Sequence, residues 1–457
     1  MLTRTSLARA AQHAARRSGA ITPRRGFAAA AAASTGSFET KDVNGLKAAS
    51  RDSHGPTTTL TVVAKAGTRY QPLPGLAYGL EQFAFKSTER RSALRIQRES
   101  ELLGGQLSAF HSREALFVQA SFLRDDLPYF TELLGEVVSS TKYTTHEFHE
   151  DVERVLGFKQ AAVNADVPAL ALDTAHSVAF HTGLGAPLNP SPTTPFRKYV
   201  NEEYIASYAD VVYSKPNLAV VAEGADAESL SKWVGQFFKG VPAAAHSGQS
   251  LKTEASKYFG GEQRTSHTGG NSIVIAFPGS NSAVSKPEIE VLAALLGGQS
   301  SIKWTPGFSL LSKSTHGISG LSASSANLAY SDAGLFTIQL SGAAASVRKA
   351  AEEAVKALKL VGAGSIAKED VSKAVAKAKF SILEKAQNRA SSILLAGSDL
   401  VHAGKVADAA ALAKSLDAVT PEKLKTAAKT LLDGKATVST VGDLFVLPYA
   451  EELGLRV

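Results

Sequence analysis

The 457-residue sequence contains no cysteine, which excludes a disulfide scaffold, thiolate zinc sites, iron–sulfur ligation and a cysteine nucleophile. No apolar run reaches the roughly 18 residues that a membrane-spanning helix requires. P-loop, dinucleotide-binding and serine-hydrolase motifs are also missing. Hydrophobic residues make up 44% of the chain and charged residues 20%, a composition typical of a folded globular protein. The length predicts about two to four domains.

The net charge of +7 is concentrated at the N-terminus. Residues 1–27 contain six arginines and no acidic residue, so the rest of the chain is nearly neutral. Phosphate binding requires a basic surface, and a nearly neutral body does not provide one. The charge therefore argues against a nucleic-acid-binding function.

The Arg-rich, acid-free N-terminal segment is typical of a mitochondrial transit peptide. A secretory signal would instead contain a continuous apolar core. Arg25, Gly26 and Phe27 precede an alanine run and resemble a matrix-processing site. We therefore expect cleavage after Phe27 and assign residues 1–38 to a transit peptide and flexible leader. A disordered basic tail is the alternative interpretation.

The remaining sequence contains an internal repeat. Three apolar segments of the first half recur in the second half in the same order and at nearly constant spacing: 107–109 at 321–323, 116–120 at 335–339, and 218–224 at 436–442. Each reads as a strand, and helices are predicted at 127–138, 344–360 and 421–432. The segments 218–224 and 436–442 are both expected to follow one helix and to precede another. The pattern predicts a duplicated domain.

The predicted fold class is α+β, with two homologous domains that each have a mixed or antiparallel sheet covered by helices. The first domain is predicted to open with a strand at 57–66, and the corresponding strand of the second lies at 272–277. Residues 240–256 are rich in Ala, Gly, Ser and Pro and read as a linker. The predicted domains are therefore 39–239 and 257–457.

The most informative stretch is 74–88, PGLAYGLEQFAFKST, in which Tyr78, Glu81 and Gln82 share one face of a predicted helix. A Gly-Gly pair follows at 104–105 and a Ser-Arg-Glu turn at 112–114. This pattern resembles the pitrilysin-type metallopeptidases, which include the mitochondrial processing peptidases. The resemblance implies a helix that, in active members, carries H-x-x-E-H, with two zinc-binding histidines and a glutamate as general base.

Carried over by position, the two histidines fall on Tyr78 and Gln82, the base on Glu81, and the third zinc ligand on Lys159. Phenol, amide and ammonium groups are poor replacements for two imidazoles and a carboxylate. The resemblance therefore implies a chain with no catalytic residue, no metal and no cofactor, in which Glu81 is a relic. A displaced functional site at these positions is the alternative.

Other histidines offer weaker candidates. His146 and His149 lie three residues apart at a predicted helix start, where a solvated helix terminus competes with metal binding. His111, His176 and His316 are isolated in the sequence, and each is predicted to be an ordinary histidine whose hydrogen bonds are satisfied.

Two non-catalytic branches of the family are relevant. The α subunit of the processing peptidase holds presequences with a glycine-rich loop, but the corresponding segment 296–309 has few glycines and contains Ile302, Trp304 and Pro306. Segments 91–105, 122–129, 330–336 and 442–449 are instead similar to the core subunits of the cytochrome b-c1 complex.

That similarity implies a structural subunit, peripheral on the matrix side of the mitochondrial inner membrane. It implies pairing with core protein 1 and contact with cytochrome b, cytochrome c1, the Rieske iron–sulfur protein and small subunits. Two other hypotheses stay open: a presequence-binding module of the α type, and half of a processing peptidase whose partner supplies zinc.

Overall fold

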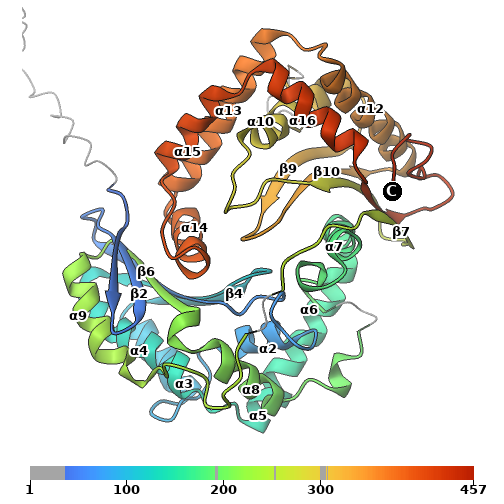
Figure 1. Cartoon of the computed structure of the whole chain (residues 1–457). Helices are drawn as coiled ribbons and strands as arrows, with labels where there is room; N and C mark the ends of the chain where they lie inside the picture. The colour runs from blue at the N-terminus through green and yellow to red at the C-terminus, as the bar shows by residue number, and fades with distance from the viewer. Residues whose placement is uncertain (1–35, 191–193, 252–253, 299–304, 306) are drawn as a thin grey trace, which may run out of the picture. The chain divides into compact units, whose positions relative to one another are not determined.

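The computed structural model describes residues 36–190, 194–251, 254–298, 305 and 307–457. The predicted transit peptide and its cleavage site after Phe27 lie outside the described residues. From Phe38 to Val457 the chain forms one compact unit that contains two β-sheets (Figure 1).

The first sheet has six strands in the order β1-β2-β6-β3-β5-β4. Only β2 and β6 pair in parallel, and the other pairs are antiparallel. The strands are β1 (Glu39–Val43), β2 (Leu46–Arg51), β3 (Thr57–Ala64), β4 (Gln106–His111), β5 (Leu116–Leu123) and β6 (Leu218–Glu223).

The second sheet has five strands in the order β7-β11-β8-β10-β9. Again one pair, β7 with β11, is parallel and the rest are antiparallel. The strands are β7 (Gly261–Ser266), β8 (Asn271–Pro278), β9 (Ser322–Ala329), β10 (Gly334–Gly342) and β11 (Thr437–Gly442).

The two sheets have the same topology once β1 is set aside. Strands β2, β6, β3, β5 and β4 correspond in order and direction to β7, β11, β8, β10 and β9. The predicted repeat is therefore confirmed, and so are the strands proposed at 116–120, 218–224 and 272–277 to within a few residues. The α+β class with mixed sheets is also confirmed.

Helices cover both sheets. Those before residue 240 are α2 (Leu76–Phe83), α3 (Ala93–Leu102), α4 (Leu127–Ser140), α5 (Thr145–Glu147), α6 (Glu153–Ala165), α7 (Val167–Phe180), α8 (Glu202–Val212) and α9 (Ala227–Phe237). Those after it are α10 (Pro287–Leu296), α11 (Leu310–Ser314), α12 (Ala344–Ala363), α13 (Lys368–Gln387), α14 (Arg389–His402), α15 (Ala409–Ser415) and α16 (Pro421–Asp433). The helices predicted at 127–138, 344–360 and 421–432 are present as α4, α12 and α16.

One predicted helix is wrong. β6 is followed by α9, but β11 is followed only by turns up to Val457. Gly442 and Gly454 adopt positive φ angles of 135° and 68°, and Pro448 lies between them, so the segment cannot continue as a regular helix.

Alternation along the strands gives each sheet two apolar faces. In β3, Leu60 and Val62 point into the core formed with the helices of the first half, whereas Val63 belongs to a separate cluster on the opposite face. The second sheet is built likewise: Ile273 and Ile275 of β8 pack into the core of the second half.

The opposite face of each sheet is covered by a helix from the other half. Helix α14 packs on the first sheet through Ile393, Ala396 and Leu400. Helix α7 packs on the second sheet through a stripe of small residues, Ala171, Ala175 and Ala179. In Figure 1 these two helices lie against β6 and β7, respectively. Because α7 and α14 each pack on the sheet of the other half, they tie the two halves together. The domain boundaries 39–239 and 257–457 stay predictions from the sequence.

Candidate functional site

Helix α2 carries the positions that correspond to the family's metal site. It begins after Gly75, whose φ of 98° suits glycine. Tyr78 and Glu81 are buried, with 1% and 7% of their surface exposed, and Gln82 is half-buried. The helix therefore places the Glu81 carboxylate inside the protein, where it requires partners.

Glu81 has such partners on both oxygens. Its Oε2 accepts the backbone N–H of His111 at 3.1 Å and contacts the His111 Nδ1. Its Oε1 accepts the side-chain amide of Gln82 at 3.0 Å. Burial alone would raise the pKa of Glu81, but the hydrogen bonds and the charges around it lower that pKa below its ordinary value. The carboxylate is therefore held in its charged form.

Lys159, on α6, supplies the nearest full positive charge. Its Nζ lies 3.6 Å from Glu81 Oε1 and 4.6 Å from the centre of the Tyr78 ring. Burial raises the pKa of the Tyr78 phenol, and its hydroxyl has no hydrogen-bond partner in the described part of the chain. The ammonium is thus placed between a carboxylate and an aromatic face.

These side chains do not fit a zinc ion. A zinc site needs about three protein ligands that present nitrogen, thiolate or carboxylate donors. Tyr78 is a neutral phenol, Lys159 is a cation with no lone pair to donate, and both oxygens of Glu81 are engaged. The arrangement can neutralise a buried carboxylate, but it offers no ligand set to a hydrolytic metal.

His111 is the site residue that sequence reasoning missed. We predicted an ordinary structural role for it, and it lies at the end of β4 with Nδ1 on Glu81 and Nε2 2.8 Å from the Leu188 carbonyl oxygen. Both ring nitrogens therefore have partners, as in an ordinary structural histidine, and the contact with Glu81 was not predicted. Its position directly before the Ser-Arg-Glu turn was the available signal, since that turn marks the strand end nearest α2.

His149, one of the two candidate histidines near residue 148, contacts a neighbouring carboxylate. His149 Nδ1 lies 2.9 Å from Glu153 Oε2, and the segment forms a short α turn followed by a wider π turn at Phe148–Val152. Glu147 is buried and accepts the Ser87 backbone N–H at 3.0 Å. Among the described residues, no group of three or more His, Cys, Asp and Glu side chains is placed to hold a metal ion.

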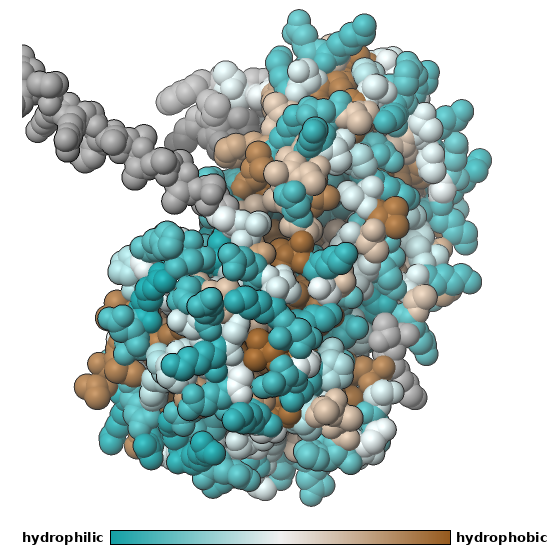
Figure 2. Space-filling model, turned by 60° about the vertical axis from the view of Figure 1, so that its left-hand side comes forward, coloured by the Kyte–Doolittle hydropathy of each residue, from teal (hydrophilic) through white to brown (hydrophobic). Residues whose placement is uncertain are grey.

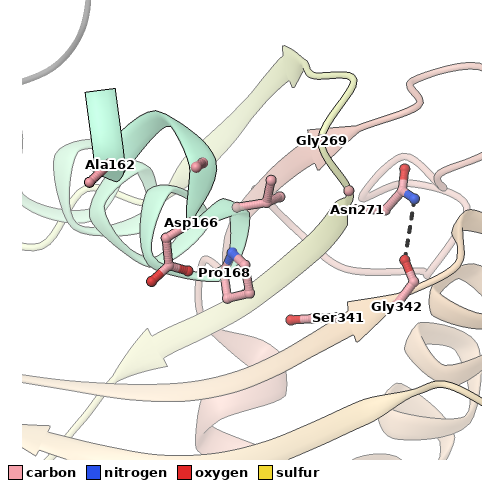
Figure 3. Close-up of a pocket in the computed structure, with 10 residues that line it drawn as sticks. Ala162, Asp166, Pro168, Gly269, Asn271, Ser341 and Gly342 are labelled. Carbon is pink, nitrogen blue, oxygen red and sulfur yellow. Dashed lines mark hydrogen bonds between the residues drawn. The ribbon is translucent and has the colours of Figure 1, made fainter. Parts of the chain in front are cut away.

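A cavity of about 490 Å³ lies away from these positions, between the start of α7 and the second sheet. Figure 3 shows Asp166 and Pro168 on one side and Ser341 on the other, with Asn271 hydrogen-bonded to Gly342. Asp166 caps α7 by accepting the Ala169 N–H at 3.1 Å. The cavity therefore brings together no acid–base or nucleophilic pair.

The Ser-Arg-Glu turn has a clear structural role. Arg69 donates to Glu114 Oε1 at 2.7 Å and to both oxygens of Asp332 at 2.7 and 2.6 Å. Glu114 in turn accepts the Ser331 N–H at 2.9 Å. Burial would raise the pKa of Asp332, but its bonds to Arg69 lower it. We call Arg69, Glu114, Ser331 and Asp332 the first clamp, because it joins the two halves.

A second clamp holds α14 to the first sheet. Arg51, at the end of β2, donates to Glu223 Oε1 at 2.8 Å and to the Ser392 hydroxyl at 2.6 Å. It also donates to the Ala386 carbonyl at 2.8 Å. Buried charges that are paired this fully favour one arrangement of the halves.

Residues 299–304 and 306, in the segment compared with the presequence-holding loop, lie outside the described residues.

Comparison with known families identifies the class. Residues 47–190 match the family model of insulinase (peptidase family M16), and residues 199–378 match that of the peptidase M16 inactive domain. The chain therefore belongs to the M16 peptidase family.

Individual relatives show which members of this family the chain is similar to. The mitochondrial cytochrome b-c1 complex subunit 2 of Neurospora crassa is 58% identical over 100% of both chains. The subunit of the same name from Schizosaccharomyces pombe is 36% identical over 91% of this chain and 95% of that one. A mitochondrial-processing peptidase subunit alpha-2 of Dictyostelium discoideum is 27% identical over 90% of this chain and 92% of its own.

Proposed function

We propose that the chain is the non-catalytic core subunit 2 of the mitochondrial cytochrome b-c1 complex. It supports assembly and stability of the ubiquinol–cytochrome c reductase and performs no hydrolysis itself. The observation that carries this is the 58% identity to the Neurospora crassa subunit along the entire chain. The two family-model matches, and the packing of α7 and α14 on each other's sheets, are consistent with a fold that serves a structural role.

The chemistry at α2 supports a non-catalytic role. A hydrolytic M16 site needs a metal and a glutamate free to accept a proton from water. Here Glu81 is bound by His111, Gln82 and the Lys159 ammonium. A carboxylate in this setting stabilises the packing of α2 against β4 and α6.

The surface supports a role in an assembly. Figure 2 shows apolar side chains scattered among polar ones on the face in view. Large apolar side chains that are more than half exposed occur on several elements: Leu94, Leu102, Leu123, Phe158, Val284, Leu360, Phe380, Phe445 and Tyr449. Obligate interfaces bury such residues over areas that often exceed about 2,000 Å².

The proposal includes a location and a set of neighbours. In the described residues no helix is long and apolar enough to cross a bilayer, which supports peripheral attachment to the mitochondrial inner membrane. We place the subunit on the matrix side, paired with core protein 1 and next to cytochrome b, cytochrome c1, the Rieske protein and small subunits. The chain itself binds no cofactor in this proposal.

The second candidate is a presequence-binding subunit of a processing peptidase. The 27% identity to the alpha-2 subunit of Dictyostelium discoideum favours it. Such a subunit would bind a basic presequence peptide without cleaving it, and it would fractionate with a soluble zinc peptidase.

One fractionation separates the two. Mitochondria that carry a tagged chain are solubilised in mild detergent, and the tagged material is sized and scanned for haem. We expect the chain in a large complex that contains b- and c-type haem, and we expect loss of that complex when the chain is deleted. A haem-free heterodimer that binds presequence peptide contradicts the proposal.

A further inference from the structure

The turn that follows β11 presents one phenylalanine entirely to solvent. Phe445 is 101% exposed, more than any other large apolar side chain in the described part of the chain, and Tyr449 beside it is 52% exposed. The buried residues Leu447 and Pro448 anchor the same turn. In Figure 1 this dark red segment loops outward beside β7.

The backbone of this turn is held by two arginines from different elements. Arg264, on β7, donates to the carbonyl oxygens of Leu444 and Pro448, both at 2.8 Å, and of Leu447 at 3.0 Å. Arg348, on α12, donates to the Val446 carbonyl at 3.1 Å.

The ends of the turn are fixed as well. Asp443 Oδ1 accepts the Phe445 N–H at 3.1 Å, and the Asp443 N–H donates to Asn271 at 2.8 Å. The Arg264 guanidinium also stacks 3.7 Å from the centre of the Tyr449 ring. A phenyl group held outward on a fixed backbone loses little freedom when it binds, which is the property of an interface anchor.

The charges around the turn indicate the kind of partner. Residues 443–455 contain three acidic residues, Asp443, Glu451 and Glu452, and no lysine or arginine. Both arginines that reach the turn are engaged: Arg264 donates to its carbonyl oxygens, and Arg348 donates to the Val446 carbonyl and pairs with Glu452. Asp443 and Glu451 are exposed acidic residues of the turn. An anionic lipid surface attracts free basic groups, so this acidic rim disfavours a membrane as the occupant.

We propose that Phe445 is an anchor for a neighbouring protein subunit, which receives it in an apolar pocket bordered by lysine or arginine. Tyr449 completes the contact, and Asp443 and Glu451 pair with the basic rim. The inference deepens the proposed function, because it names a surface through which the subunit would hold a neighbour in the complex.

Site-directed crosslinking tests the partner. Phe445 is replaced by the photoreactive p-benzoylphenylalanine in the full chain within the isolated complex, and the adduct is identified by mass spectrometry. Leu102, which is 87% exposed on α3, receives the same replacement as the control. We expect Phe445 to crosslink to one protein segment that contains basic residues and that the Leu102 control does not label. A lipid adduct alone, or no adduct, overturns the proposal.

Substitution tests the strength of the contact. Phe445→Ala removes a side chain without packing partners, so the thermal unfolding of the chain is expected to stay unchanged. The rate at which the chain is lost from the complex in detergent is expected to rise roughly tenfold, the effect of an anchor residue. Phe445→Tyr is expected to leave that rate unchanged. Equal rates for wild type and Phe445→Ala contradict the anchor, whereas absence of the chain from any haem-containing complex contradicts the proposed function instead.

Discussion

A buried histidine between the halves makes a quantitative prediction about acid stability. His176 of α7 donates from Nδ1 to the Leu172 carbonyl at 2.8 Å, and its Nε2 accepts from the Tyr330 hydroxyl at 2.7 Å. Burial, with the nearby Arg113 charge, lowers the pKa of His176 from 6.5 to about 3. The folded chain therefore holds this ring neutral at pH values where the unfolded chain protonates it.

The sign and size of the effect follow from linkage. Because the folded pKa lies below the unfolded one, the unfolded state binds the proton first and stability falls as pH drops below 6.5. A pH of 5 lies about 1.5 units below the pKa of the unfolded histidine, which is therefore protonated, while the folded ring is still neutral. This difference corresponds to about 2 kcal/mol of lost stability. Above pH 7 the loss is close to zero.

Denaturant unfolding of the purified chain at pH 7 and pH 5 measures this loss. We expect the His176→Gln variant to lose about 2 kcal/mol less than wild type between the two pH values, because glutamine does not titrate. His316→Gln, which changes an exposed histidine, is the control and is expected to follow wild type. Identical pH dependence for wild type and His176→Gln would refute the reasoning.

Two further substitutions test the ion pairs. Asp332→Asn removes the charge that Arg69 binds with two hydrogen bonds, and should lower the unfolding free energy by about 2 kcal/mol. Glu353, which pairs with the exposed Lys356, serves as the control, since Glu353→Gln should cost less than about 0.5 kcal/mol. Equal losses would contradict the first clamp. Lys159→Glu places a second carboxylate near Glu81 and should destabilise the chain by about 1 kcal/mol, more than Lys159→Gln does. If thermal melts show Lys159→Gln to be less stable than Lys159→Glu, Lys159 does not neutralise Glu81.

The central strands could be predicted because their chemistry is local. β3 reads Thr-Thr-Thr-Leu-Thr-Val-Val-Ala, and β-branched runs of this kind favour a strand wherever they pack. β1, β2 and β7 were not predicted. β1 (ETKDV) and β7 (GEQRTS) are short polar edge strands, and β2 and β7 find their partners more than 150 residues away, in β6 and β11.

The exchange of α7 and α14 had no local signal. Both helices are rich in small apolar residues, a pattern that fits any sheet, and only the tertiary structure determines which sheet they cover. The candidate site likewise contains residues that the sequence predicts and one that it does not. Position predicted that Tyr78, Glu81, Gln82 and Lys159 would share one site. The partner His111 depends on the register of β4, which a motif does not encode.

The zinc content of the purified chain, separated from every partner and dialysed against zinc at neutral pH, tests the central claim most directly. With Lys159 beside Glu81 and a phenol and an amide where imidazoles would be needed, we expect far less than one zinc ion per chain. One zinc ion per chain that is lost in Glu81→Gln, together with cleavage of a presequence peptide, would contradict the account.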